Sequence, residues 1–291
     1  MNIKNILVPL DFSASAEQAF EYAEFLADKF AANLTLLHTI LSSEVGSDEE
    51  MDLMDYERIV KKIERNKNEL LKEYVLKATA KEIPVEAIIT RGFSAGDSIL
   101  DFINTGKYDL VVMGSRSGSG LIKWNLGSVA EKVIHASSIP VFTLHHSVEE
   151  FAINRILIPV DFSNVARDAS KLALSLGKIF KSDVEFLHVV DKKRAYANGD
   201  SNSKKQTTPQ VEERIQNHLS TFIDNRLENI DLHVKEGKIP EEIVDYANQN
   251  KHDLIIMATG EKSGLDYLQI GSNTNCVVRL AHCPVLTINK S

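Results

Sequence analysis

The chain has 291 residues, enough for one large or two ordinary domains, and 43% of them are hydrophobic and 25% charged, as in globular proteins. No apolar run approaches the roughly 18 residues that cross a bilayer. The formal net charge of −8 argues against a general nucleic-acid role, because phosphate backbones require clustered Lys and Arg. Residues 1–5 lead into a predicted strand without a signal peptide, and two cysteines, Cys276 and Cys283, lack the second pair of a zinc site. We therefore expect a cytoplasmic protein that binds neither membranes nor nucleic acid.

The first predicted strand, residues 6–8, opens a series of motifs that runs through the chain twice. It leads into PLDFS at residues 9–13, which returns as PVDFS at residues 159–163. Further pairs follow in the same order: LLHT and FLHV, YDLVVMG and HDLIIMA, LGS and IGS, IPVFT and CPVLT. A period of this length indicates a duplicated domain rather than a solenoid. We place the two domains at residues 1–147 and 152–291.

Within each copy, short apolar runs alternate with segments of helical periodicity, which predicts βαβ units. In the first copy, strands are expected at residues 6–8, 34–37, 85–89, 110–113 and 141–144, and their apolar character is typical of strands buried on both faces. Helices are expected at residues 16–30, 56–81 and 95–105 and from Gly127 onward, with Ser13 as the first N-cap and Ser163 as its counterpart. Each copy is predicted to be an α/β domain, with helices covering a five-stranded parallel sheet.

Two polar segments, residues 44–57 and 192–210, follow the second strand of their copies. We expect each to be a mobile loop that enters the long helix. A partner or phosphorylation site is the alternative.

The candidate ligand site lies beyond the carboxyl ends of the strands, where ligands of open parallel sheets bind. Asp11 follows the first strand, and the fourth strand leads into a Gly- and Ser-rich loop at residues 114–120, before Gly127 and Ser128 open a helix. Glycines let backbone amides approach a phosphate, a helix N-terminus adds N–H donors, and Arg116 adds a charged donor. Asp11 would accept hydrogen bonds from a sugar. The chain has no GxxxxGK[ST] motif, and Pro-Leu-Asp rather than GxGxxG follows the first strand, which argues against a P-loop NTPase and a dehydrogenase.

These motifs resemble those of the universal stress protein family: a strand ending in Pro-x-Asp-Phe-Ser, a Val-Met-Gly-Ser strand, a spaced Gly-Ser and a closing Ile-Pro-Val strand. The resemblance covers both copies nearly end to end. It implies a tandem member with two Rossmann-like domains of the adenine nucleotide alpha hydrolase-like type, and its ATP-binding branch, marked by Gly-x2-Gly-x9-Gly-Ser/Thr, implies ATP with Mg²⁺ as ligand.

Carried over onto this sequence, the nucleotide-binding positions of the first copy and their neighbours are Pro9, Leu10, Asp11, Thr39, Met113, Gly114, Arg116, Ser117, Gly118, Gly127, Ser128 and Val129. The middle glycine of the motif falls on Ser117, which would cost about 1–2 kcal/mol if that position needs a positive φ.

The second copy departs further from the motif. Ala258 and Glu261 stand at its first two glycines, and the Glu261 carboxylate would repel phosphates. A second, weaker site is expected at Asp161, Val189, Ala258, Gly260, Gly271 and Ser272. Three alternatives stay open for it: no ligand, a less negatively charged ligand, or a purely structural role.

Several repeated polar residues have simpler structural explanations. We expect hydrogen-bonded, partly buried histidines at the ends of the second strands (His38, His188), turn carboxylates before the fourth strands (Asp109, Asp253), and helix or turn caps after the first strands (Asp11, Asp161).

Two functions compete. The first is a regulatory protein of the stress response that binds ATP, and the second is an interaction module whose ligand site has degenerated. No Asp, Glu or His in the first glycine loop fills the role of a base, so at most weak ATPase activity is expected. The resemblance further implies that residues 140–145 and 284–289 pair within the chain; whether two such chains form a homodimer stays open.

Overall fold

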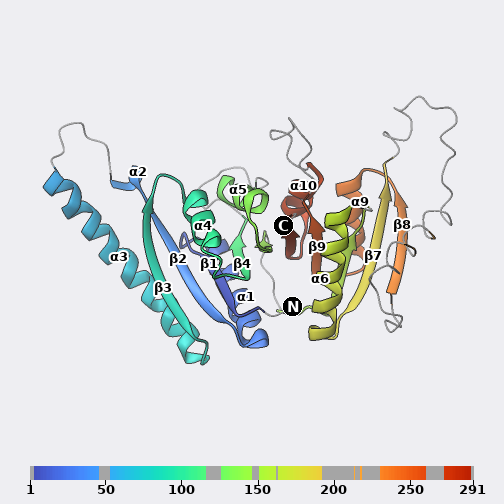
Figure 1. Cartoon of the computed structure of the whole chain (residues 1–291), viewed down its shortest axis with the longest axis horizontal. Helices are drawn as coiled ribbons and strands as arrows, with labels where there is room; N and C mark the ends of the chain where they lie inside the picture. The colour runs from blue at the N-terminus through green and yellow to red at the C-terminus, as the bar shows by residue number, and fades with distance from the viewer. Residues whose placement is uncertain are drawn as a thin grey trace. The chain divides into compact units, whose positions relative to one another are not determined.

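The computed structural model describes residues 3–45, 53–115, 126–145, 151–161, 163–191, 213, 217, 230–259 and 272–289. It divides into two compact units, Asn2–Phe151 and Ala152–Lys290, called here the first and the second unit. Figure 1 shows the elements of each unit along the chain. No helix in the described part of the chain is long and apolar enough to cross a membrane.

The first unit contains a sheet whose described strands are all parallel, as predicted. They are β1 (Asn5–Pro9), β2 (Asn33–Leu41), β3 (Val85–Gly92), β4 (Leu110–Gly114) and β5 (Val141–Leu144). Their order is β3-β2-β1-β4-β5. The chain therefore builds outward from β1 to β3 and then crosses to the other side of β1, so the strand order reverses between β1 and β4.

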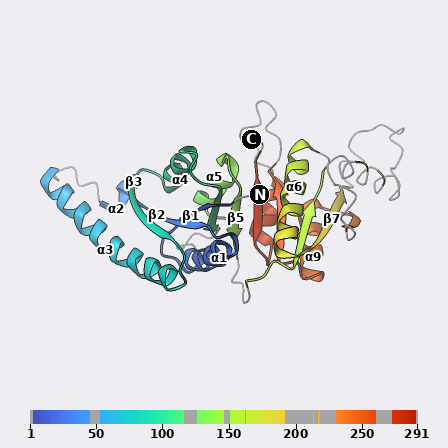
Figure 2. The same ribbon diagram turned by 60° about the horizontal axis from the view of Figure 1, so that its bottom comes forward.

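Helices cover both faces of this sheet: α1 (Ala14–Phe30), the short α2 (Ser42–Val45), α3 (Leu53–Ala80), α4 (Ala95–Asn104) and α5 (Ser128–Ala136). In Figure 2, α1 and α3 lie on one face and α4 and α5 on the other. The predicted N-cap of α1 is confirmed, because the Ser13 Oγ accepts the N–H of Ala16 at 3.2 Å. The apolar positions of α1 are buried at the predicted spacing: Ala16, Ala19, Phe20, Ala23, Leu26 and Ala27.

The second unit repeats this plan with β6 (Arg155–Pro159), β7 (Asp183–Val190), β8 (Ile230–Glu236), β9 (Leu254–Ala258) and β10 (Val285–Ile288). The strands are parallel in the order β10-β9-β6-β7-β8. Its described helices are α6 (Asn164–Phe180), α9 (Ile239–Gln249) and α10 (Ser272–Leu280). Ser163 caps α6 by accepting the N–H of Ala166 at 3.1 Å, as predicted.

Two expectations for the first unit are wrong. β3 is partly exposed along its length instead of being buried on both faces, because it is the edge strand next to β2. The segment 44–57 is helical at Glu44 and Val45 and again from residue 53, because Val45 packs with Ile40 and Val60. Residues 46–52 and 192–210 lie outside the described part of the chain.

Candidate ligand-binding site

A cavity of about 420 Å³ lies at the carboxyl ends of β1, β2 and β4, where the strand order reverses. Its wall contains the predicted residues Pro9, Leu10, Asp11, Thr39, Met113, Gly114, Gly127, Ser128 and Val129. Arg116, Ser117 and Gly118 lie outside the described residues. The structure thus brings together every predicted site residue of the first copy that it describes.

Gly114 ends β4 directly against the start of α1. A Cβ atom at this position would lie 2.8 Å from the backbone carbon and oxygen of Ser15, closer than real Cβ atoms approach. Ser15 and its neighbour Ala16 both line the cavity. Gly114 is therefore required for close approach, and its conformation needs no positive φ.

The N-terminus of α5 forms one end of the cavity. Its N-cap is Gly127, which has no side chain and donates its own N–H to the Ser115 oxygen at 2.8 Å. The first-turn residues Ser128, Val129 and Ala130 all line the cavity, and within the described residues no side chain caps them. An uncapped helix N-terminus presents N–H donors and the positive end of the helix dipole. This end of the cavity suits an anionic group.

Asp11 lies in the turn between β1 and α1. Its Oδ1 accepts the N–H of Ser13 at 2.9 Å, which confirms the expected turn role. Phe12, next to it, adopts a left-handed conformation with φ of 64°, and its ring packs 4.7 Å from the His38 ring. Asp11 nevertheless remains exposed on the cavity wall, so the turn leaves a carboxylate available to a ligand.

His38 is a buried residue of the cavity wall. Its Nδ1 lies 2.7 Å from the Leu10 oxygen, and because a carbonyl only accepts, Nδ1 carries the proton. Burial lowers the pKa of His38, and nearby Lys67 acts in the same direction, so the ring is neutral near pH 7. The expected hydrogen-bonded histidine is confirmed here, and His188 makes the same contact with the Val160 oxygen at 2.7 Å.

Sequence reasoning missed several residues of the cavity wall. Leu41, Glu44 and Lys67 come from the end of β2, from α2 and from α3, and Ala95 and Ile99 come from α4. The i, i+4 spacing of the last two on a predicted helix was an available signal. Glu44 and Lys67 gave none, because they meet only through the packing of α2 and α3 on the end of β2.

The second unit repeats part of this arrangement. The Oδ1 of Asp161 accepts the N–H of Ser163 at 3.0 Å, and Val189 is buried in β7. Ala258 ends β9, and its oxygen accepts the Thr274 hydroxyl at 3.3 Å. Gly260, Gly271 and the side chain of Ser272 lie outside the described residues.

The pair Gly114 and Ser15 is replaced in the second unit by Ala258 and the buried Val165. A methyl group therefore stands where the first unit has no side chain, and an isopropyl group replaces a hydroxyl. Both changes make this edge of the second unit less polar.

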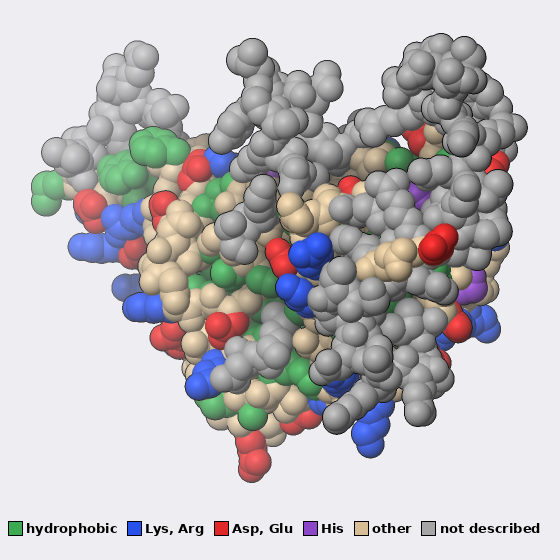
Figure 3. Space-filling view, turned by 45° about the vertical axis from the view of Figure 1, so that its right-hand side comes forward, with side chains coloured by type: hydrophobic (Ala, Val, Ile, Leu, Met, Phe, Trp, Pro, Cys, Tyr) green, Lys and Arg blue, Asp and Glu red, His purple; other side chains and the backbone are tan. Residues whose placement is uncertain are grey.

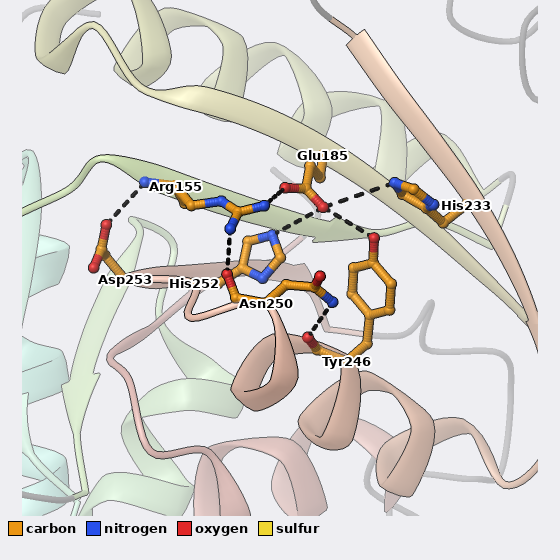
Figure 4. A network of polar contacts seen from close by, with 7 residues as sticks. All are labelled: Arg155, Glu185, His233, Tyr246, Asn250, His252 and Asp253. Atoms are coloured by element: carbon orange, nitrogen blue, oxygen red, sulfur yellow. Dashed lines mark hydrogen bonds and ion pairs between the residues drawn. The ribbon is translucent and has the colours of Figure 1, made fainter.

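The second unit has a polar network at the amino ends of its strands, shown in Figure 4. At its centre is Glu185 of β7, whose side chain is 5% exposed and forms an ion pair with Arg155. The other carboxylate oxygen, Oε2, accepts the Tyr246 hydroxyl at 3.0 Å and lies 3.4 Å from the His252 Nε2 and 3.8 Å from the His233 Nε2. The network joins three strands and α9.

The protonation states in this network follow from its contacts. Burial alone would raise the pKa of Glu185, but Arg155, His252 and Tyr246 lower it overall. Burial lowers the pKa of His252, and burial together with Glu185 raises the pKa of Tyr246. An ionised Glu185 beside a neutral His252 and a neutral Tyr246 is the stable arrangement near pH 7.

In each unit, one carboxylate at the amino ends of the strands has the structural role predicted for it. The Asp109 Oδ2 accepts the N–H of Asn5 at 3.0 Å, and the Asp253 Oδ2 accepts the N–H of Arg155 at 2.9 Å. Each joins the start of a central strand to the turn before its neighbour.

In Figure 3, acidic and basic side chains are interspersed over the described part of the face that is shown.

Comparison with known proteins gives a consistent result. The family model described as Universal stress protein family matches residues 2–145 and again residues 152–289. A universal stress protein of Methanocaldococcus jannaschii is 33% identical over 139 residues, which cover 47% of this chain and 82% of that protein. One from Synechocystis is 26% identical over 307 aligned positions, covering 98% of this chain and 99% of that protein. The crystal structure of a universal stress protein from Archaeoglobus fulgidus superposes with a TM-score of 0.75, at 22% identity and over 100% of both chains, and supports the fold.

Proposed function

The chain belongs to the universal stress protein family, with two copies of the family domain in tandem, and from this premise we propose that its first unit binds ATP. The protein would act as a regulatory module of the stress response in the cytoplasm, with at most weak ATPase activity. The observation that carries the proposal is a cavity whose one end is the uncapped N-terminus of α5 and whose wall includes the Asp11 carboxylate.

The shape and chemistry of the cavity support this ligand. Its volume of about 420 Å³ lies within the usual range for sites of small molecules. The amides of the first turn of α5 would hold phosphates, with Mg²⁺ bound to the nucleotide, and Asp11 would accept from a sugar hydroxyl. Thr39 and Ile99 would flank the base.

For the second unit we propose weak binding or none. Ala258 and Val165 replace Gly114 and Ser15, and Glu261, three residues after Ala258 in the sequence, adds a negative charge. The pairing of residues 140–145 with residues 284–289 and the homodimer remain predictions.

Native mass spectrometry of the purified protein tests the proposal. We expect one adenine nucleotide per chain, and a higher melting temperature in millimolar Mg-ATP. The variant Gly127→Asp should lose this nucleotide, because a carboxylate at the α5 N-cap would occupy and repel the phosphate position. Gly271→Asp, at the matching position of the second unit, is the control and should keep it. Absence of both nucleotide and thermal shift in the wild-type protein would refute the proposal. An unchanged number of nucleotides per chain in Gly127→Asp would show that the nucleotide binds at another place.

A further inference from the structure

A serine and a histidine form a buried pair next to the α5 end of the cavity. Ser115 directly follows β4, His145 directly follows β5, and the two residues are 0% and 4% exposed. The Ser115 Oγ lies 3.1 Å from the Leu144 oxygen and 3.0 Å from the His145 Nδ1. Because the hydroxyl has one proton and a carbonyl only accepts, both contacts are hydrogen bonds when the His145 Nδ1 donates. Neither residue is among the described residues that line the cavity, so any influence on a ligand passes through their neighbours.

The backbone of Ser115 connects this pair to the N-terminus of α5. Its oxygen accepts the N–H of Gly127, the N-cap of α5, at 2.8 Å, and its own N–H donates to the Leu144 oxygen at 2.9 Å. The helix α5 packs on β5, beside which it lies in Figure 2. On the other side of Ser115, Gly114 is fixed by its close approach to Ser15. A shift of Ser115 is therefore passed directly to the start of α5, because Gly127 has no side chain of its own to cap the helix.

The second unit repeats the pair with different residues. Thr259 directly follows β9, and its N–H donates to the Ile288 oxygen at 2.8 Å, as that of Ser115 does to Leu144. The Thr259 hydroxyl lies 3.3 Å from the same Ile288 oxygen and forms a hydrogen bond with the Asn289 Oδ1. The chain itself therefore shows that threonine and asparagine fit at the places of the serine and the histidine.

We infer that Ser115 and His145 are positioning residues that hold the N-terminus of α5 where its amides bind the phosphates, an inference that rests on the proposed nucleotide binding. The amides of the first turn of α5 bind an anion well only when their N–H groups point at it, because hydrogen bonds weaken steeply as they bend. Asp11, at the proposed sugar position, follows β1 and is held by its own turn. The pair therefore acts on the phosphates and leaves the contacts to the nucleoside unchanged.

Titration calorimetry of the full chain with Mg-ATP and with adenosine tests the inference. Ser115→Ala should weaken Mg-ATP about fivefold and leave adenosine unchanged, because adenosine has no phosphate to bind at α5. His145→Leu should have the same two effects, and the double variant should lose little more than either, because the two side chains share one hydrogen bond. The variants are read separately, so one decides if the other does not fold. Equal weakening of both ligands would mean that the pair only stabilises the fold, and full Mg-ATP affinity in a folded variant would equally overturn the inference.

Two conservative variants copy the pair of the second unit. Ser115→Thr and His145→Asn keep a hydroxyl and a polar partner, so each should bind Mg-ATP within about twofold of the wild type. Thr259→Ala is the matched control in the second unit and should change neither affinity. A loss in Ser115→Thr as large as that in Ser115→Ala would show that the hydroxyl is not what positions α5. If the wild-type protein binds neither ligand, the proposed function itself fails, an outcome distinct from normal Mg-ATP binding with no effect of the variants.

Discussion

In the first unit, Gly114 ends β4 in close contact with Ser15, and in the second unit Ala258 ends β9 with Val165 at the matching place. At the amino ends of the strands, the second unit instead carries the more polar residues. The first unit has a neutral Thr35, whose hydroxyl donates to Glu86 at 2.9 Å.

The second unit has the buried Glu185 at the position of Thr35 and the buried His252 at the position of Tyr108. At the amino ends of the strands, the second unit therefore carries a buried carboxylate and a buried histidine where the first unit carries a threonine and a tyrosine. A parallel sheet tolerates this divergence because the carboxyl and amino ends of its strands are separated by the length of the strands. The side chains at one end do not contact those at the other.

The largest expected effect concerns the network of the second unit. Glu185→Ala removes the carboxylate that contacts the side chains of Arg155, Tyr246 and His252, and should lower the free energy of unfolding by about 3 kcal/mol. The partly exposed Arg155 keeps the loss at the low end of the range for buried pairs. Thr35→Ala, the matching change in the first unit, should cost about 1 kcal/mol. Hydrogen exchange of β7 and β2 measures both, and equal losses would mean that the network adds nothing beyond one hydrogen bond.

The second-largest effect is expected from exchanging Gly114 and its counterpart Ala258, at the carboxyl ends of β4 and β9. Gly114→Ala places a Cβ 2.8 Å from the Ser15 backbone, so α1 must shift; we expect a loss of about 2 kcal/mol and of the bound nucleotide. The reciprocal Ala258→Gly should leave the nucleotide stoichiometry unchanged. Thermal melts and native mass spectrometry report the two quantities. A Gly114→Ala protein with normal stability and nucleotide content would show that the close approach is dispensable.

A smaller effect depends on pH. The pKa of His252 is lowered from its ordinary value of 6.5, so below that pH the unfolded chain takes up a proton that the folded form resists. Stability is therefore lost as the pH falls below 6.5, with a slope of at most about 1.4 kcal/mol per pH unit. The pKa of Glu185 is lowered from 4.5, so its contribution is present above that pH and is lost as the pH falls further. Urea unfolding of the wild type and His252→Gln should show a shallower acid loss in the variant; parallel curves would exclude His252 as the cause.

The smallest effect should be the same in both units. Ser13→Ala and Ser163→Ala each remove an N-cap with nearly the same geometry, and each should cost about 1 kcal/mol. Chemical denaturation of the two variants provides the comparison. A clear inequality would show that the two helix starts differ in strain even though they share the motif Asp-Phe-Ser.

Much of the fold and the site was predictable because the signals are local. The strand periodicity, the serine caps and the carboxylates that accept from turn amides depend on residues close in sequence or on repeated motifs. The exposure of β3 was missed because an apolar run does not reveal whether its strand lies at the edge of the sheet. The helix α2 was missed because its four residues are fixed by the burial of Val45 against Val60.

The duplication, the α/β class and the residues that follow each strand could be established from the order and spacing of motifs along the chain. Three features became known only from the folded chain: which of those residues share a cavity, why Gly114 cannot carry a side chain, and that Lys67 meets Glu44 beside the cavity. These contacts join segments distant in sequence, and their geometry is set by how helices pack on the ends of strands, which no local pattern encodes.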